Sequence, residues 1–200
     1  MPEADLHRET ALVLAAGRGT RMGGPKALMQ VRGQVWWREQ RKRIEQWVMP
    51  QLWVISEAVH VVFGPQHDAP PIVVGDDTAP MFTSVLGGLR ALAVDPPSAV
   101  YVLPIDVPAC DVESVRALRQ AGALPSVPVL ATTKQRGHPV RLPWSFVETA
   151  ILQHATDPAW CESARLDGLL RAHAVDVEVA DQTVAVNLNT PEAVERWAST

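Results

Sequence analysis

The sequence has little cysteine and no pattern that would use it. Its 200 residues contain two cysteines, Cys110 and Cys161. They form no CxxC pair and have no Cys/His neighbours at the spacing of a zinc site. Two such isolated residues are more typical of buried thiols than of a disulfide. The sequence therefore gives no reason to expect a disulfide-stabilised scaffold or a zinc domain.

Long apolar runs, basic blocks and low-complexity tracts are also missing. No segment approaches the ~20 apolar residues of a membrane span, and the first ten residues are too polar for a secretory signal. The net charge is −4, with 20% charged residues, which is neither the footprint of a nucleic-acid-binding protein nor that of a disordered chain. We expect a cytoplasmic monomer or homodimer without nucleic-acid or membrane partners.

What the sequence does contain is a regular alternation of apolar patterns. With 47% hydrophobic residues and no obvious linker, residues 1–200 suit a single domain. Strands are expected at 11–16, 59–63, 72–74, 99–103, 127–132, 140–142, 175–179 and 183–188, whereas 52–55 fits a strand or a helix end. Helices are expected at 35–48, 84–94, 144–154 and 163–173. Two more are expected, one that starts at an Asp111 N-cap and reaches about residue 121, and one that starts at Pro191. This order predicts an α/β sandwich of three layers with a Rossmann-like, mainly parallel sheet.

The segment after the first predicted strand reads LAAGRGTRMGGPK, from Leu14 to Lys26. Glycines let such a loop turn tightly and bring its N–H groups close to phosphate oxygens. Arg18, Arg21 and Lys26 add three positive charges within nine residues, about the charge that a nucleoside triphosphate presents. The loop is therefore a candidate phosphate site, and the alternative is a tight connection with solvated arginines.

Two better-known phosphate motifs do not fit this loop. The glycines are spaced Gly17-x-Gly19-x-x-x-Gly23 rather than GxGxxG, and no acid follows at a strand end about 20 residues later, as dinucleotide binding requires. A Walker loop needs Gly-Lys-Ser/Thr, but Lys26 stands between Pro25 and Ala27. The sequence thus excludes both motifs.

A second polar position follows the predicted strand 99–103, at Asp106. In parallel sheets, ligands bind beyond the carboxyl ends of the strands. Both Gly17 and Asp106 fall at such ends, so we expect them to face one site. The alternative for Asp106 is a turn or helix-cap residue before Pro108.

These motifs resemble those of the MobA-like nucleotidyltransferases, whose signature is LAAGxGxRMGxPK. The resemblance continues in family order along nearly the whole chain. The further motifs are Leu103-Pro104-Ile105-Asp106-Val107-Pro108, Gly137-His138-Pro139 and Asn187-Leu188-Asn189-Thr190-Pro191-Glu192. Molybdenum cofactor cytidylyltransferases and guanylyltransferases are the most similar branches, and the wider group includes sugar-phosphate nucleotidyltransferases. The implied fold is of the nucleotide-diphospho-sugar transferase type.

The resemblance implies a Mg²⁺-dependent enzyme that moves a nucleotidyl group from a nucleoside triphosphate to a phosphorylated acceptor, molybdopterin cofactor first among the candidates. Arg18, Arg21 and Lys26 would be catalytic. The residues implied for metal binding are Asp106 with Asn187 or Asn189. The residues implied for substrate binding are Leu14, Ala15, Ala16, Gly17, Gly19, Thr20, Ser84 and His138.

The choice of base and acceptor stays open at this stage. A side chain at Ala16 and the His138 motif favour CTP, whereas Asn187 and Asn189 look more like the guanylyl branch. Residues 80–84 and 160–165 also depart from the cytidylyl pattern. The alternatives are another phosphorylated acceptor, such as a sugar phosphate, and a nucleotide-binding module without turnover.

Two residue pairs have simpler interpretations. Asp76 and Asp77 are expected in a solvated loop. Trp36 and Trp37 fit a helix face in the core, or else a subunit contact.

Overall fold

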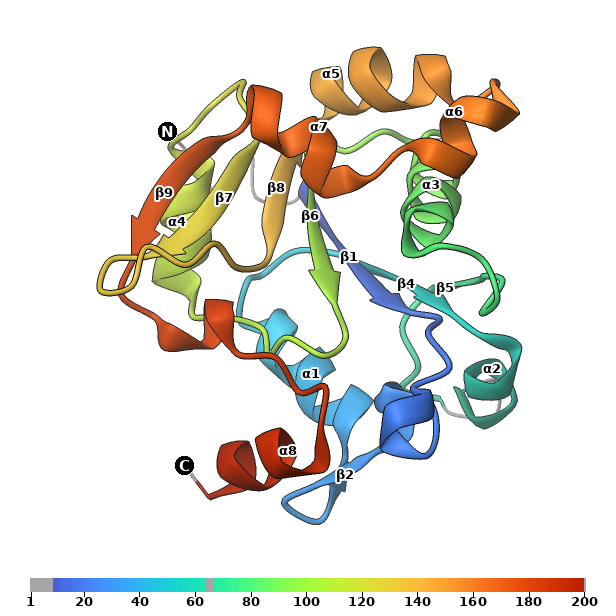
Figure 1. Ribbon diagram of the computed structural model, residues 1–200, viewed down its shortest axis with the longest axis vertical. Helices are drawn as coiled ribbons and strands as arrows, with labels where there is room; N and C mark the ends of the chain where they lie inside the picture. Colours follow the sequence, from blue (N-terminus) through green and yellow to red (C-terminus); the bar gives the residue numbers. More distant parts are fainter. Residues whose placement is uncertain (1–8, 64–66, 200) are drawn as a thin grey trace.

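The computed structural model describes residues 9–63 and 67–199, which build a seven-stranded sheet in the order β5-β4-β1-β6-β8-β7-β9 (Figure 1). Strand β8 is antiparallel to β6 and β7, and the other pairings between described strands of this sheet are parallel. The strands are β1 (Glu9–Ala15), β4 (Gln51–Ile55), β5 (Ile72–Val74), β6 (Ala99–Pro104), β7 (Ser126–Leu130), β8 (Val140–Pro143) and β9 (Val175–Val179). A separate hairpin pairs β2 (Gln30–Val31) with β3 (Gln34–Val35). The predicted mainly parallel α/β sheet is confirmed.

Helices cover both faces of this sheet and complete the three layers (Figure 1). One face carries α1 (Trp36–Glu45), α2 (Glu57–Phe63), α4 (Val112–Arg119) and α8 (Pro191–Ala198). The other carries α3 (Met81–Leu92), α5 (Trp144–Phe146), α6 (Pro158–Ser163) and α7 (Leu166–His173). Helix α5 continues through a π-helical turn, Val147–Ile151, into a 3₁₀ turn, Leu152–His154. In the described part of the chain, no helix has the length and apolarity needed to cross a membrane.

Strand β1 shows how the two cores are divided. Its side chains alternate between the faces of the sheet, as strand geometry requires. Val13 and Ala15 pack in the core under α1, whereas Leu12, Leu14 and Ala16 pack in the core under α3. Because both faces are buried, the strand reads as the continuous apolar run seen in the sequence.

The predicted strand at 59–63 is wrong, because these residues form helix α2. The β-branched run suggests a strand, but Val59 and Phe63 are buried four residues apart while Val61 and Val62 are exposed, which is helical periodicity. Ser56 starts the helix, since its backbone carbonyl accepts from the Val59 N–H at 3.0 Å. Gly64-Pro65, which follow this run and would be expected to end a strand, lie outside the described residues.

The predicted strand at 183–188 is also wrong. Residues Gln182–Ala185 form a 3₁₀ helix, because Asp181 caps it by accepting the Thr183 N–H at 2.9 Å. Val184 and Leu188 are buried, so the apolar pattern reports core contacts rather than sheet pairing. By contrast, residues 52–55 are part of strand β4, and the predicted N-cap at Asp111 and the helix start at Pro191 are confirmed.

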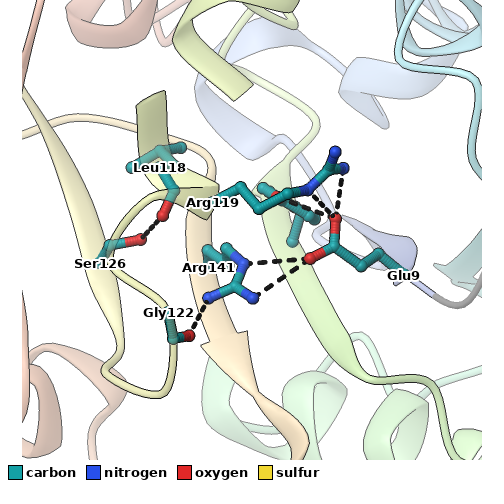
Figure 2. A network of polar contacts seen from close by, with 7 residues as sticks. Glu9, Leu118, Arg119, Gly122, Ser126 and Arg141 are labelled. Carbon is teal, nitrogen blue, oxygen red and sulfur yellow. Dashed lines mark hydrogen bonds and ion pairs between the residues drawn. The ribbon is translucent and has the colours of Figure 1, made fainter. Parts of the chain in front are cut away.

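A buried ionic network lies where strand β1 begins, at the end of the sheet away from the carboxyl ends of the parallel strands (Figure 2). Glu9, at the start of β1, receives hydrogen bonds from Arg119 of α4 and from Arg141 of β8. Glu9 and Arg141 are almost fully buried, and the Tyr101 hydroxyl also donates to Glu9 at 3.2 Å. Burial and the charge of Glu9 raise the pKa of Tyr101, which keeps this donor protonated. The network ties β1, β6, β8 and α4 together.

We expect Glu9→Gln to lower the free energy of unfolding by about 3–5 kcal/mol, because it leaves two guanidinium groups without their buried counter-charge. Urea denaturation would measure the loss. The control is Glu113→Gln, which breaks an exposed ion pair with Arg116 and should change stability by less than ~1 kcal/mol. Equal effects of the two substitutions would show that the network contributes no more than a surface pair.

Candidate active site

A cavity of about 410 Å³ opens where β1, β5 and β6 end. Its wall combines the ends of β1 and β6, the loop after β1, the loop after β5, the start of α3 and one residue before α8. The lining residues are Leu14, Ala16, Gly17, Gly19, Thr20, Arg21, Lys26, Asp76, Asp77, Ala79, Met81, Ser84, Pro104, Ile105, Asp106 and Asn189. Four segments distant in sequence therefore meet at one edge of the sheet.

Parallel pairing of β1 with β6 sets the centre of this cavity. Leu14 pairs with Pro104, and the Ile105 N–H continues the ladder by donating to the Leu14 carbonyl at 3.0 Å. The segments that follow β1 and β6 therefore leave the sheet side by side. Gly17 and Asp106 consequently line the same cavity, as the argument from strand ends predicts.

The glycine loop folds back on itself through Gly19. Its φ is +60°, and a Cβ at this position would lie 1.9 Å from the Gly24 carbonyl oxygen. The Gly19 carbonyl accepts from the N–H groups of Met22 and Gly24 at 2.8 and 3.2 Å. Only glycine fits such a left-handed, crowded position, and the closed loop carries the chain round to Lys26.

Lys26 lies at the centre of the polar contacts in the cavity. Its ammonium donates to Asp106 Oδ2 at 2.8 Å and to the side-chain oxygen of Asn189. The Lys26 and Asp106 side chains are only 19% and 17% exposed, so their attraction is screened less than that of a surface pair. Three motifs separated by up to 163 residues are thus joined by one cation.

The two arginines of the loop differ in position. Arg21 lines the cavity, whereas Arg18 stands at its rim, 54% exposed, with its Nε 3.1 Å from Asp77 Oδ1. Both are exposed enough to reorient toward a ligand. Thr20, between them in the chain, also lines the cavity.

Asp76 and Asp77 were expected to lie in a solvated loop, but they also form part of the cavity wall. Asp76 is exposed and accepts from the backbone and hydroxyl of Thr78, which lowers the pKa of its carboxyl. Both carboxylates nevertheless line the cavity. The sequence held the signal, because these residues directly follow β5, at the carboxyl end of a parallel strand. Met81 was missed as well, and it projects at the start of α3 with 59% exposure.

Some predicted site residues are not brought into the cavity lining. The Ala15 side chain packs in the core on the other face of the sheet. Asn187 is exposed, and the buried Leu188 separates it from Asn189. The Leu188 N–H donates to the Asp106 carbonyl at 2.8 Å, so this strand-like segment lies beside Asp106 but aims only Asn189 at the cavity.

His138 lies behind the cavity rather than in its wall. Its N–H donates to the Val184 carbonyl at 2.9 Å, and a Cβ on Gly137 would lie 2.0 Å from that oxygen. Burial lowers the pKa of His138, although the charge of Asp106 acts in the opposite direction. The imidazole is therefore neutral at pH 7, and its Nδ1 has no hydrogen-bond partner among the described residues. The close approach of the backbone at Gly137 to Val184 explains why the Gly137-His138-Pro139 motif begins with a glycine.

Helix α1 holds the segment that carries Asp106. Trp36 donates its indole N–H to the Ile105 carbonyl at 2.6 Å, and the buried Gln40 donates to the Val107 carbonyl and accepts from the Ala109 N–H at 2.9 Å. Arg43 of the same helix donates to the Ala109 carbonyl, and Trp47, just beyond the end of the helix, donates to the Cys110 carbonyl. We call this set of contacts the α1 ladder. Trp36 and Trp37 are buried, so they serve the core rather than a subunit contact.

The cavity offers oxygen ligands suited to a hard cation. Within residues 9–63 and 67–199, no group of three or more His, Cys, Asp or Glu residues could hold a metal by itself. Asp106 and Asn189 supply one carboxylate and one amide oxygen, and they already hold a cation, the Lys26 ammonium. This set fits Mg²⁺, which binds through one or two protein oxygens and completes its shell with phosphate and water.

The fold and the cavity define an α/β protein with a glycine loop, cationic side chains and carboxylates gathered at the carboxyl edge of its parallel strands. Residues 11–177 match the family described as the MobA-like NTP transferase domain. The chain belongs to this family of nucleotidyltransferases, which confirms the resemblance found in the sequence motifs.

Individual relatives agree with this assignment. The chain is 32% identical over 183 residues to a molybdenum cofactor guanylyltransferase from Pseudomonas syringae pv. syringae, covering 90% of this chain and 88% of that protein. A molybdopterin-guanine dinucleotide biosynthesis protein A from Archaeoglobus fulgidus superposes with a TM-score of 0.66 at 17% identity, over 95% and 97% of the two chains. A 2-C-methyl-D-erythritol 4-phosphate cytidylyltransferase from Thermus thermophilus gives 0.69 at 17% identity, over 96% and 100%. The two structures support the fold alone.

We expect Gly19→Ala to weaken nucleotide binding by about tenfold or more, because the new Cβ forces the loop open at a left-handed position. Gly24→Ala is the matched control, since a Cβ there meets nothing within 4 Å. Titration with CTP and GTP by calorimetry would measure both variants, with circular dichroism to check folding. Unchanged affinity in Gly19→Ala would mean that the loop shape does not determine binding.

Proposed function

We propose that the protein transfers a nucleotidyl group from a nucleoside triphosphate to the terminal phosphate of molybdenum cofactor and releases pyrophosphate. The observation that carries this proposal is the Lys26–Asp106–Asn189 contact beside the glycine loop. It joins a phosphate-binding cation to oxygen ligands for a metal inside one cavity. The acceptor is inferred from the named activity of the Pseudomonas relative.

The transfer is an in-line displacement at the α-phosphorus. An oxygen of the acceptor phosphate forms the new P–O bond, the bond to the β-bridging oxygen breaks, and that oxygen leaves with pyrophosphate. A phosphate monoester is already ionised, so the reaction depends on positioning and charge stabilisation more than on a general base. His138 is outside the cavity wall, which is consistent with a reaction that does not need a general base.

The cationic side chains then have separate roles. Lys26 and Arg21 face the cavity and would neutralise the triphosphate and the departing pyrophosphate, while Arg18 would reach it from the rim. Loop N–H groups around Gly17 and Gly19 would donate hydrogen bonds to phosphate oxygens. Asp106 and Asn189 would hold Mg²⁺, which supplies Lewis-acid stabilisation of phosphate charge when bound.

We expect Asp106→Asn to lower Mg²⁺-dependent turnover by about a hundredfold or more, because it removes the carboxylate from the proposed metal site. Pyrophosphate release, measured with each of four triphosphates and with molybdenum cofactor or sugar phosphates as acceptors, would test both the residue and the acceptor. The control is Asp176→Asn, which alters an exposed ion pair with Arg136. Normal turnover in Asp106→Asn would exclude it as the metal ligand, and activity with sugar phosphates alone would exclude the proposed acceptor.

A finer part of the proposal concerns the nucleotide base: we propose that the protein prefers CTP to GTP. Ala16 and Ser84 both line the cavity, and the Ala16 methyl group takes up room that a glycine would leave free beside a base. This narrow wall suits the smaller pyrimidine. GTP is the second candidate, favoured by the guanylyltransferase relative and by the Asn187 and Asn189 motif.

We expect CTP to bind about ten- to a hundredfold more tightly than GTP in calorimetry with Mg²⁺. Ala16→Gly should reduce this preference by about tenfold, because it removes the methyl group beside the base. Ala15→Gly makes the same change on the opposite face of β1 and should leave the preference unchanged. Tighter binding of GTP by the wild type would overturn the cytidylyl assignment.

A further inference from the structure

The Lys26 ammonium lies at the place where the proposed metal ion would bind. It contacts Asp106 Oδ2 at 2.8 Å and also engages the Asn189 side-chain oxygen. These are the two side chains to which the proposed function assigns the metal. One ammonium group therefore uses both of them when no nucleotide is bound.

The other carboxylates of the cavity are already engaged. Asp77 pairs with Arg18, and Asp76 accepts two hydrogen bonds from Thr78. Lys26 and a divalent cation would both depend on Asp106 for charge compensation. Two like charges a few ångströms apart in a half-buried site repel strongly, so the ammonium and the metal exclude each other.

We propose that Lys26 blocks the metal site in the free protein and that the nucleotide opens it. This inference rests on the proposed function, because it uses the same metal site. Lysine carries its charge on a flexible four-carbon stem, so the ammonium can swing from Asp106 to a triphosphate lying along the glycine loop. That movement frees Asp106 and Asn189 at the moment when phosphate oxygens become available to complete a metal shell.

Binding of metal and nucleotide is therefore positively coupled through one side chain. Each ligand raises the affinity for the other by the same factor, as linkage requires. The coupling weakens the binding of a metal ion to the free protein. It also ensures that Lys26 contacts phosphate whenever the metal is in place.

The test measures Mn²⁺ binding to the nucleotide-free full chain by calorimetry or electron paramagnetic resonance. Lys26→Met should bind Mn²⁺ about tenfold or more tightly than the wild type, because it removes the competing cation. Lys26→Gln, a second neutral variant, should behave in the same way. Lys26→Arg keeps the positive charge and should remain weak.

Lys134→Met is the matched control. It makes the same change of charge at an exposed lysine that pairs with Glu178, away from the cavity. It should bind Mn²⁺ like the wild type, which separates local competition from a change in net charge.

The outcomes distinguish this inference from the proposed function. In the Lys26→Met background, Asp106→Asn should remove the tight Mn²⁺ site. If Lys26→Met binds Mn²⁺ no more tightly than the wild type, but Asp106→Asn still removes that binding, then Asp106 holds the metal and Lys26 does not block it. If Asp106→Asn leaves Mn²⁺ binding unchanged, the metal site itself is misplaced and both proposals fail on this point.

Discussion

The parallel pairing of β1 with β6 is the constraint on which the rest of the structure depends. It brings the glycine loop and Asp106 out of the sheet at the same edge, because Leu14 and Pro104 are partners in register. Neither segment could form the site alone, since one supplies cations and backbone donors and the other supplies the carboxylate. A shift of one residue would turn the side chains of β1 to opposite faces, moving Ala16 out of the cavity wall and into the other core.

The segment after β6 has to hold its shape without regular secondary structure. Its carbonyls at 105, 107, 109 and 110 are satisfied by the α1 ladder instead of by strands or water. Buried backbone groups need such partners, and Gln40 supplies both a donor and an acceptor. Trp36 and Trp47 thus do more than fill the core. They fix the direction in which the chain presents Asp106 to the cavity.

Sequence patterns predicted the parts of this molecule that local chemistry determines. The buried run of β1, the loop glycines, the Asp111 cap and the strand end at Asp106 each carry their signal within a few residues. The strand expected at 59–63 failed because β-branched residues also fit a short helix when only Val59 and Phe63 face the core. The α1 ladder and the choice of Asn189 over Asn187 were beyond local reasoning, because both depend on contacts more than 60 residues away in the chain.

Stability and function are placed at opposite ends of the same strands. The Glu9 network ties the start of β1 to β6, β8 and α4 (Figure 2), whereas the cavity lies beyond the carboxyl ends of β1 and β6. In the free protein, the charged groups of the cavity are paired with each other, as Lys26 with Asp106 and Arg18 with Asp77. These pairs are more exposed than the Glu9–Arg141 pair, so the proposed exchange for phosphate contacts would disturb little buried charge. A buried ionic anchor at one end and more exposed ion pairs at the other would let the loop rearrange around a nucleotide, as the proposed function requires, while the sheet keeps its register.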